Sequence, residues 1–105
     1  MDLRNIAIIE LLYSTGIRVS ALCGLDLEDI DRARNTIRVF GKGRKERTVP
    51  LGAPALKAID RWISDARASY VSVTSGLALF LGARGKRIDP RTVREVVYSA
   101  LQALP

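Results

Sequence analysis

The apolar residues near the start of the chain are dense enough to cover most of the circumference of a helix. They are Ile6, Ile8, Ile9, Leu11, Leu12 and Tyr13. Asp2 can cap a helix that runs from about Leu3 to Ser14, and Thr15-Gly16 interrupts it. We therefore predict a well-buried first helix. A second, shorter helix is expected from about Ile17 to Leu22, ended by Gly24.

Two later segments also repeat their apolar residues at helical spacing. The first runs from Ala53 to Ser69, and its expected core stripe is Leu56, Ile59, Ile63 and Ala66, with Trp62 at the edge. The second begins at Asp89-Pro90, a capping residue followed by proline at the first helical position. Its apolar stripe is Val93, Val96, Val97, Ala100, Leu101 and Leu104. Both segments are predicted to be amphipathic helices.

Between these helices the apolar residues follow a period of two. Thr36 to Phe40 alternates and is rich in β-branched residues, and Arg47 to Leu51 can form its partner strand. The intervening Gly41-Lys42-Gly43-Arg44-Lys45-Glu46 supplies glycines for a turn, so a β-hairpin with a basic tip is predicted. Leu79-Phe80-Leu81 and Lys86-Arg87-Ile88 are expected to form short extended pieces.

Composition changes this picture mainly by exclusion. The 105 residues fit one domain, and an apolar content of 48% is enough for a core. Histidine is absent and Cys23 is the only cysteine, so we expect no intrachain disulfide and no metal site. We interpret Cys23 as a packed thiol in a reducing compartment. The apolar runs are too short to span a bilayer, and we expect a cytoplasmic protein without membrane contact.

Basic residues are concentrated in the predicted hairpin. Seven of them lie from Arg32 to Arg47, opposed by Asp31 and Glu46, and a second cluster consists of Arg84, Lys86, Arg87, Arg91 and Arg94. The net charge of +6 favours a polyanionic partner, although charge alone does not separate DNA, RNA, anionic lipid and mere solubility. We predict that Arg38 and Arg47 share a face and bind phosphates in one groove. The alternative is a solvated surface.

Arg18 and Lys42 are the two candidates for chemistry. Arg18 lies near the predicted start of the second helix, about where a capping box would place a Glu. A helix N-terminus prefers an anion, so a bound phosphate would explain an arginine there. Lys42 can donate a proton to a leaving alkoxide, whereas a guanidinium cannot release protons but can clamp phosphate oxygens. The pair suits phosphoryl transfer without a metal ion.

Two segments resemble the motifs of the tyrosine recombinases, the phage-integrase family. Leu11-Leu12-Tyr13-Ser14-Thr15-Gly16-Ile17-Arg18-Val19-Ser20-Ala21-Leu22 resembles the motif that carries the family's first catalytic arginine. Gly41-Lys42-Gly43-Arg44-Lys45-Glu46-Arg47-Thr48-Val49-Pro50-Leu51 resembles the β-hairpin that carries its catalytic lysine. The order and separation of the motifs also match. The likeness is strongest for Xer-type recombinases and extends over essentially the whole chain.

The resemblance implies a fold and a chemistry. The fold would be α+β and mainly α, with helices packed around a small antiparallel β-hairpin or three-stranded sheet. Arg18 would bind the scissile phosphate, and Lys42 would protonate the departing 5′-oxygen. The expected contacts with the DNA backbone are Arg38, Arg44, Lys45 and Arg47. The family cleaves double-stranded DNA through a tyrosine, forms a 3′-phosphotyrosine bond and rejoins strands without a metal ion or nucleotide, so no cofactor is expected.

The chain also departs from the family pattern. The later motif with a histidine or lysine and the second catalytic arginine is missing, as are the following histidine or tryptophan and the nucleophilic tyrosine. Tyr13, Tyr70 and Tyr98 lack the nucleophile's context, and we interpret them as structural. Ala21 occupies a position that is usually acidic in the family. We expect residues 1–105 to be a partial catalytic domain, without the core-binding domain and the C-terminal catalytic half, and inactive alone.

Three interpretations of the whole chain stay open. The first is a fragment of a recombinase whose complete form is a DNA-assembled tetramer. The second is a truncated DNA-binding or regulatory module. The third is a basic helical interaction domain without a DNA role. Leu101 and Leu104 belong to a face that later helices of the complete domain would cover. If that face is exposed, we expect a homodimer or a partly dynamic monomer.

Overall fold

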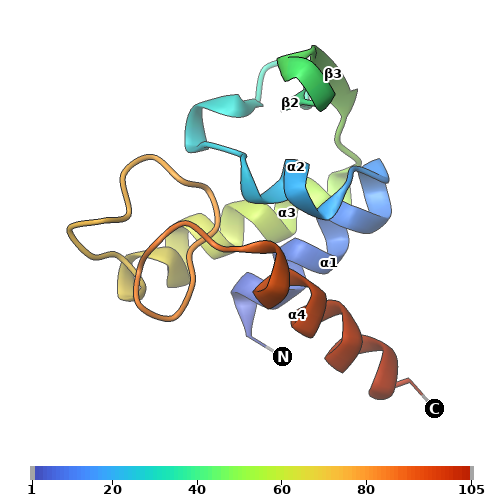
Figure 1. Ribbon diagram of the computed structural model, residues 1–105. Coiled ribbons are helices and arrows are strands. Elements are labelled where there is room, and N and C mark those ends of the chain that lie inside the picture. Colours follow the sequence, from blue (N-terminus) through green and yellow to red (C-terminus); the bar gives the residue numbers. More distant parts are fainter. Residues whose placement is uncertain (1, 105) are drawn as a thin grey trace.

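The structure, a computed structural model, describes residues 2–104. In this part of the chain the α-helices are α1 (Leu3–Thr15), α2 (Val19–Cys23), α3 (Ala53–Arg61) and α4 (Pro90–Gln102), and the strands are β1 (Ile30–Asp31), β2 (Thr36–Phe40) and β3 (Glu46–Pro50). After α3 the chain stays helical, as a π-helical turn (Trp62–Ala66) and a 3-10 turn (Arg67–Ser69). The three strands form one antiparallel sheet that lies at one end of the helices (Figure 1). The predicted α+β, mainly helical fold is confirmed. None of the described helices is long and apolar enough to cross a membrane.

Helix α1 begins and ends where local chemistry predicts. The Asp2 carboxylate accepts a hydrogen bond from the Asn5 backbone N–H at 2.8 Å, which satisfies a donor of the first turn. The helix ends at Gly16, which adopts the left-handed conformation (φ 64°) that favours glycine. Its buried residues are Ala7, Ile8 and Leu11. Burial is one-sided rather than complete, since Tyr13 is 89% exposed.

The sheet has the strand order β1-β2-β3, and its register decides which side chains share a face. Arg38 pairs with Thr48, and Val39 pairs with Arg47. Directly paired residues point to the same face, so Arg47 shares the face on which Ile37 and Val39 are buried. Arg38 points to the opposite face. The prediction that Arg38 and Arg47 share a face is wrong, because the register differs by one residue from the one that would pair them.

Trp62 lies in the centre of the core, not at the edge of a stripe. Helix α3 buries Ala55 and Ile59, and Trp62 continues this face at the spacing i, i+4, i+7. Leu56 and Ile63, which were expected to belong to the core stripe, are only half-buried. The buried face is thus rotated by about one residue from the predicted one.

Three neighbours hold the indole of Trp62. Its Nε1 donates a hydrogen bond to the Leu79 carbonyl at 2.9 Å. The Phe80 ring stacks on it at 6.2 Å between centroids, and the Tyr70 ring meets it edge-on at 5.1 Å. These contacts fasten the long connection between α3 and α4 to the helical core.

Helix α4 starts at the predicted place but leaves the C-terminal end of its apolar stripe uncovered. Asp89 caps it by accepting a hydrogen bond from the Thr92 backbone N–H at 2.8 Å. Val93 and Val96 are buried, whereas the stripe's C-terminal members Leu101 and Leu104 are 60% and 66% exposed. The helix runs away from the other elements toward its C-terminal end (Figure 1). The expected exposure of this face is therefore confirmed.

Candidate functional site

Arg18 and Lys42 line one cleft between the start of α2 and the β2–β3 hairpin. One lobe, of about 270 Å³, is lined by Arg18, Ala21, Val39, Gly41, Lys42 and Arg47. A second lobe, of about 330 Å³, is lined by Arg18, Ser20, Ala21, Phe40, Gly41 and Lys42. We call the two lobes together the Arg18–Lys42 cleft. The fold thus brings together two cations that lie on separate segments.

Arg18 occupies a different position in its helix from the predicted one. It is the N-cap residue of α2, with an extended backbone (φ −70°, ψ 151°), and its side chain forms no capping hydrogen bond. The helix begins only at Val19, because the chain leaves α1 through Gly16 and the buried Ile17. The expectation that Arg18 takes the place of a capping-box Glu is therefore wrong. Arg18 is exposed and lines both lobes of the cleft.

Lys42 is carried by a tight, hydrogen-bonded turn. The Gly41 N–H donates to the Lys45 carbonyl at 2.8 Å, and the Arg44 N–H donates to the Gly41 carbonyl at 3.0 Å. Gly43 and Arg44 both have positive φ (72° and 60°), which is common for glycine and unusual for arginine. These bonds determine the path of the hairpin tip, and Lys42, Arg44 and Lys45 are all exposed there.

The four predicted DNA contacts occupy three different places. Arg47 lines the Arg18–Lys42 cleft, and Arg44 and Lys45 lie at the hairpin tip. Arg38 lies on the far face of the sheet, where its Nε and Nη2 donate to one oxygen of Asp29 at 3.0 and 2.9 Å. The hydrogen bond and charge of Asp29 raise the pKa of Arg38. Its charge is thus compensated inside the protein, unlike that of the cleft residues.

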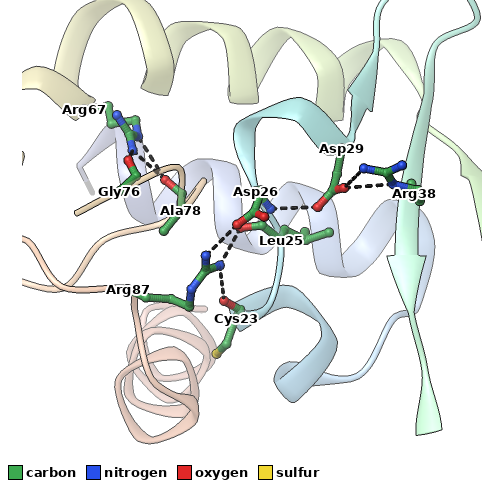
Figure 2. A network of polar contacts seen from close by, with 9 residues as sticks. All are labelled: Cys23, Leu25, Asp26, Asp29, Arg38, Arg67, Gly76, Ala78 and Arg87. Atoms are coloured by element: carbon green, nitrogen blue, oxygen red, sulfur yellow. Dashed lines mark hydrogen bonds and ion pairs between the residues drawn. The ribbon is translucent and has the colours of Figure 1, made fainter. Parts of the chain in front are cut away.

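Arg87 is a residue whose role the sequence did not reveal, since it was assigned only to a basic cluster. Its Nη1 donates to the carbonyls of Cys23 and Leu25 at 3.1 and 2.9 Å, and its Nη2 donates to Asp26 Oδ1 at 2.5 Å. Figure 2 shows this guanidinium hydrogen-bonded at the C-terminal end of α2. The sequence feature that could have indicated a polar network here is the pair Asp26 and Asp29, which lie three residues apart around a helical turn.

The remaining candidates for chemistry lie away from the cleft. Among the described residues that line it there is no tyrosine. Tyr70 packs on Trp62, and Tyr13 and Tyr98 are exposed on helices. Cys23 is buried, and burial, followed by the charge of Asp89, raises the pKa of its thiol, as a packed cysteine requires. Within residues 2–104, no group of three or more His, Cys, Asp or Glu side chains could hold a metal ion.

Known proteins are similar in sequence over nearly the whole chain. The tyrosine recombinase XerC of Mycobacterium sp. (strain KMS) is 52% identical over 104 residues, and XerC of Mycobacterium tuberculosis is 53% identical. Each match covers 99% of this chain and 35% of the relative, so the chain spans about a third of the length of these proteins. The sequence likeness includes both segments that form the cleft.

Solved structures agree with the sequence relatives. The crystal structure of XerA recombinase matches with a TM-score of 0.82 at 31% identity, over 96% of this chain and 36% of that one. XerH recombinase bound to its palindromic difH substrate matches with a TM-score of 0.75 at 25% identity, over 93% and 29%. The sequence pattern of the phage integrase family matches residues 1–104. This chain therefore belongs to the phage integrase family.

Proposed function

We propose that this chain supplies the phosphate-binding part of the active site of a site-specific DNA recombinase. One observation carries the proposal: Arg18 and Lys42, from separate segments, line the same cleft. A cleft lined by both side chains would let a guanidinium and an ammonium act on one phosphodiester group. In this assignment residues 1–105 are part of a catalytic domain.

The two cations have different tasks in strand cleavage. The Arg18 guanidinium binds the non-bridging oxygens of the scissile phosphate and stabilises the negative charge that grows on them. A tyrosine supplied from outside these residues loses its phenolic proton to solvent, and its oxygen attacks phosphorus and forms the new P–O bond. The P–O5′ bond breaks, and the Lys42 ammonium gives its proton to the departing 5′-oxygen. Without the tyrosine and the second arginine, the 105 residues alone bind DNA and do not cleave it.

The remaining basic residues hold the DNA backbone. Arg47 in the cleft and Arg44 and Lys45 at the hairpin tip extend the positive surface beyond Lys42. Among the structural relatives, XerH is bound to its difH substrate and the Tn1549 transposon integrase to circular intermediate DNA, which supports double-stranded DNA as partner. Arg38 would contact DNA only from the far face of the sheet, so we assign it a minor contribution to DNA binding. In a complete cytoplasmic protein, four copies would assemble on DNA.

A duplex titration tests this function on the chain itself. We expect sequence-independent binding with a Kd of about 1–100 µM, weakening roughly fortyfold between about 50 and about 200 mM salt if three phosphates are contacted. Arg18→Ala, Lys42→Ala and Arg47→Ala should each weaken binding and lower the salt dependence. Lys57→Ala is the matched control, since it removes an exposed lysine from α3, in a separate groove. Equal effects of Lys42→Ala and Lys57→Ala would contradict the proposal.

The uncovered face of α4 supports self-association of the isolated chain as a homodimer. Leu101 and Leu104 offer exposed apolar surface next to the half-buried Val97 and Ala100. Sedimentation should show a concentration-dependent dimer that Leu101→Glu with Leu104→Glu returns to a monomer. A compact monomer at all concentrations, with a cooperative melt, would contradict this part of the proposal.

A further inference from the structure

A continuous chain of polar contacts joins the two walls of the Arg18–Lys42 cleft behind its surface. Arg87 binds the carbonyls of Cys23 and Leu25 and the carboxylate of Asp26. The Asp26 N–H donates to Asp29 Oδ2 at 2.8 Å, and Asp29 Oδ1 accepts from Arg38 on β2. Figure 2 shows the contacts running in one line from the approach to α4 to the sheet.

We propose that Arg87, Asp29 and Arg38 are positioning residues that hold Arg18 and Lys42 at a constant separation across the cleft. The inference rests on the proposed function, because a defined separation matters only if both cations bind one phosphate. None of the three residues lines the cleft. They act through the segments that carry the two cations.

The Arg18 wall needs an external support. Helix α2 has only five residues, and an isolated helix of that length is unstable because nucleation is costly. Arg18 is its N-cap and Cys23 its last residue, so a bond to the Cys23 carbonyl restrains the same short helix from the other end. The guanidinium also satisfies carbonyls that a helix end leaves unpaired. Backbone pairing at Leu25, whose carbonyl also accepts from the Leu79 N–H at 2.9 Å, connects the helix to the core.

The Lys42 wall is held through β2. Arg38 lies on this strand, four residues before Lys42, and both of its bonds to Asp29 approach the same carboxylate oxygen. Asp29 is 5% exposed, and its two oxygens bind Arg38 and the Asp26 N–H. A buried carboxylate that loses a partner is costly, so this joint resists sliding of β2 relative to the turn at Leu27–Asp29. The hairpin tip therefore follows the position of that turn.

Arg67 provides a matched comparison within the same molecule. Its Nε and Nη2 donate to the Ala78 carbonyl at 3.2 and 2.6 Å, and burial lowers its pKa. It is thus also an arginine that binds backbone carbonyls of a loop. It fastens the loop near Ala78 to the end of the α3 segment, and Figure 2 shows its contacts apart from the line of contacts that joins Arg87, Asp29 and Arg38. Ala78 pairs with Asp26, but Arg67 itself binds neither the end of α2 nor β2, so its loss should lower stability while changing the cleft much less than the loss of Arg87.

A double-mutant cycle measures whether the two cations act on one phosphate. Duplex affinity is measured for the parent chain, Arg18→Ala, Lys42→Ala and the double variant. We expect a coupling of about threefold, because each cation contributes fully only when the other holds the same group. In the Arg87→Gln background the coupling should fall to about onefold, and in Arg87→Lys it should be intermediate, since an ammonium cannot reproduce the planar fork. In the Arg67→Gln background it should stay at about threefold.

A second measurement does not depend on DNA. Spin labels are placed at Ser20→Cys and Lys45→Cys in a Cys23→Ala chain, which keeps the Cys23 carbonyl that Arg87 binds. Electron–electron distances should be narrowly distributed in this parent and in Arg67→Gln, and broad in Arg87→Gln and in Arg38→Gln. If Arg87→Gln does not fold, Arg87→Lys takes its place in both experiments.

The outcomes separate the inference from the function on which it rests. A folded Arg87 variant that keeps both the coupling and a narrow distance distribution overturns the positioning role. Broadening in Arg67→Gln equal to that in Arg87→Gln also overturns it, because the effect would then be general loosening. If Arg18→Ala and Lys42→Ala leave duplex affinity unchanged, the proposed function fails, and the distance measurement alone decides whether the network sets the geometry.

Discussion

The Arg18–Lys42 cleft and the network of Arg87, Asp29 and Arg38 use basic residues for opposite purposes. On the cleft side, Arg18, Lys42 and Arg47 form no ion pair with any residue in 2–104. On the network side, Arg38 and Arg87 are paired with Asp29 and Asp26. An uncompensated surface cation stays available for an external anion, whereas a compensated one binds the protein to itself. A basic residue is therefore free to bind an external anion only where no carboxylate or carbonyl of the protein lies close enough to pair with it.

The largest expected effect comes from removing the buried carboxylate of the network. Asp29→Ala breaks the bonds to the Asp26 N–H and to Arg38, and we expect the free energy of unfolding to fall by about 2 kcal/mol. The control is Glu28→Ala, which removes the neighbouring exposed carboxylate and should change stability by less than about 0.5 kcal/mol. Urea denaturation measures both. Equal losses would show that the two carboxylates are equivalent and would remove the contrast between the cleft and the network.

The cleft side should show the reverse behaviour. Arg18→Ala removes an exposed side chain without a capping bond, so the free energy of unfolding should change by less than about 0.5 kcal/mol. Duplex affinity should fall about tenfold, the size expected for one charge-assisted contact. Denaturation and fluorescence anisotropy on the same preparation separate the two effects. A clear loss of stability would show that Arg18, like Arg38 and Arg87, stabilises the fold.

A smaller effect concerns the cap of α4 and depends on pH. The Thr92 N–H, as hydrogen-bond donor to the carboxylate, holds the pKa of Asp89 below its usual value. A lowered folded-state pKa stabilises the fold above the unfolded pKa of about 4, and this contribution disappears as pH falls through the folded value. Asp89→Ala should therefore lower the Tm by a few degrees at pH 7, with the difference vanishing near pH 2. A difference that persists in acid would mean that the carboxylate charge is not responsible.

No effect is expected from the tyrosines. A nicked suicide substrate that traps a phosphotyrosine should give no covalent adduct with the 105 residues, because Tyr13, Tyr70 and Tyr98 all lie outside the described lining of the cleft. Tyr13→Phe, at the most exposed tyrosine, should leave duplex binding unchanged. Denaturing electrophoresis detects an adduct, and its formation would show that the chain brings its own nucleophile.

Local features of the fold were predictable because local bonds create them. The caps at Asp2 and Asp89 and the strand from Thr36 to Phe40 follow from side chains within three or four residues or from alternation. The exposed end of α4 was expected from the resemblance, because later helices of a complete domain would cover it. Two residues could not be placed in this way. Trp62 is central because the whole buried face of α3 is rotated, and Arg87 is structural because three acceptors distant in sequence surround it.

By itself the sequence determined the main helices, the basic hairpin and the two cations, since these depend on residue type and short spacing. The tertiary structure alone decided which cations meet. Register is a property of paired strands, and a shift of one residue sends a side chain to the other face, so Arg47 joins Arg18 and Lys42 while Arg38 joins Asp29. Long-range strand pairing thus decided that Arg47 lines the cleft and that Arg38 binds the protein itself, a difference that the sequence could not show.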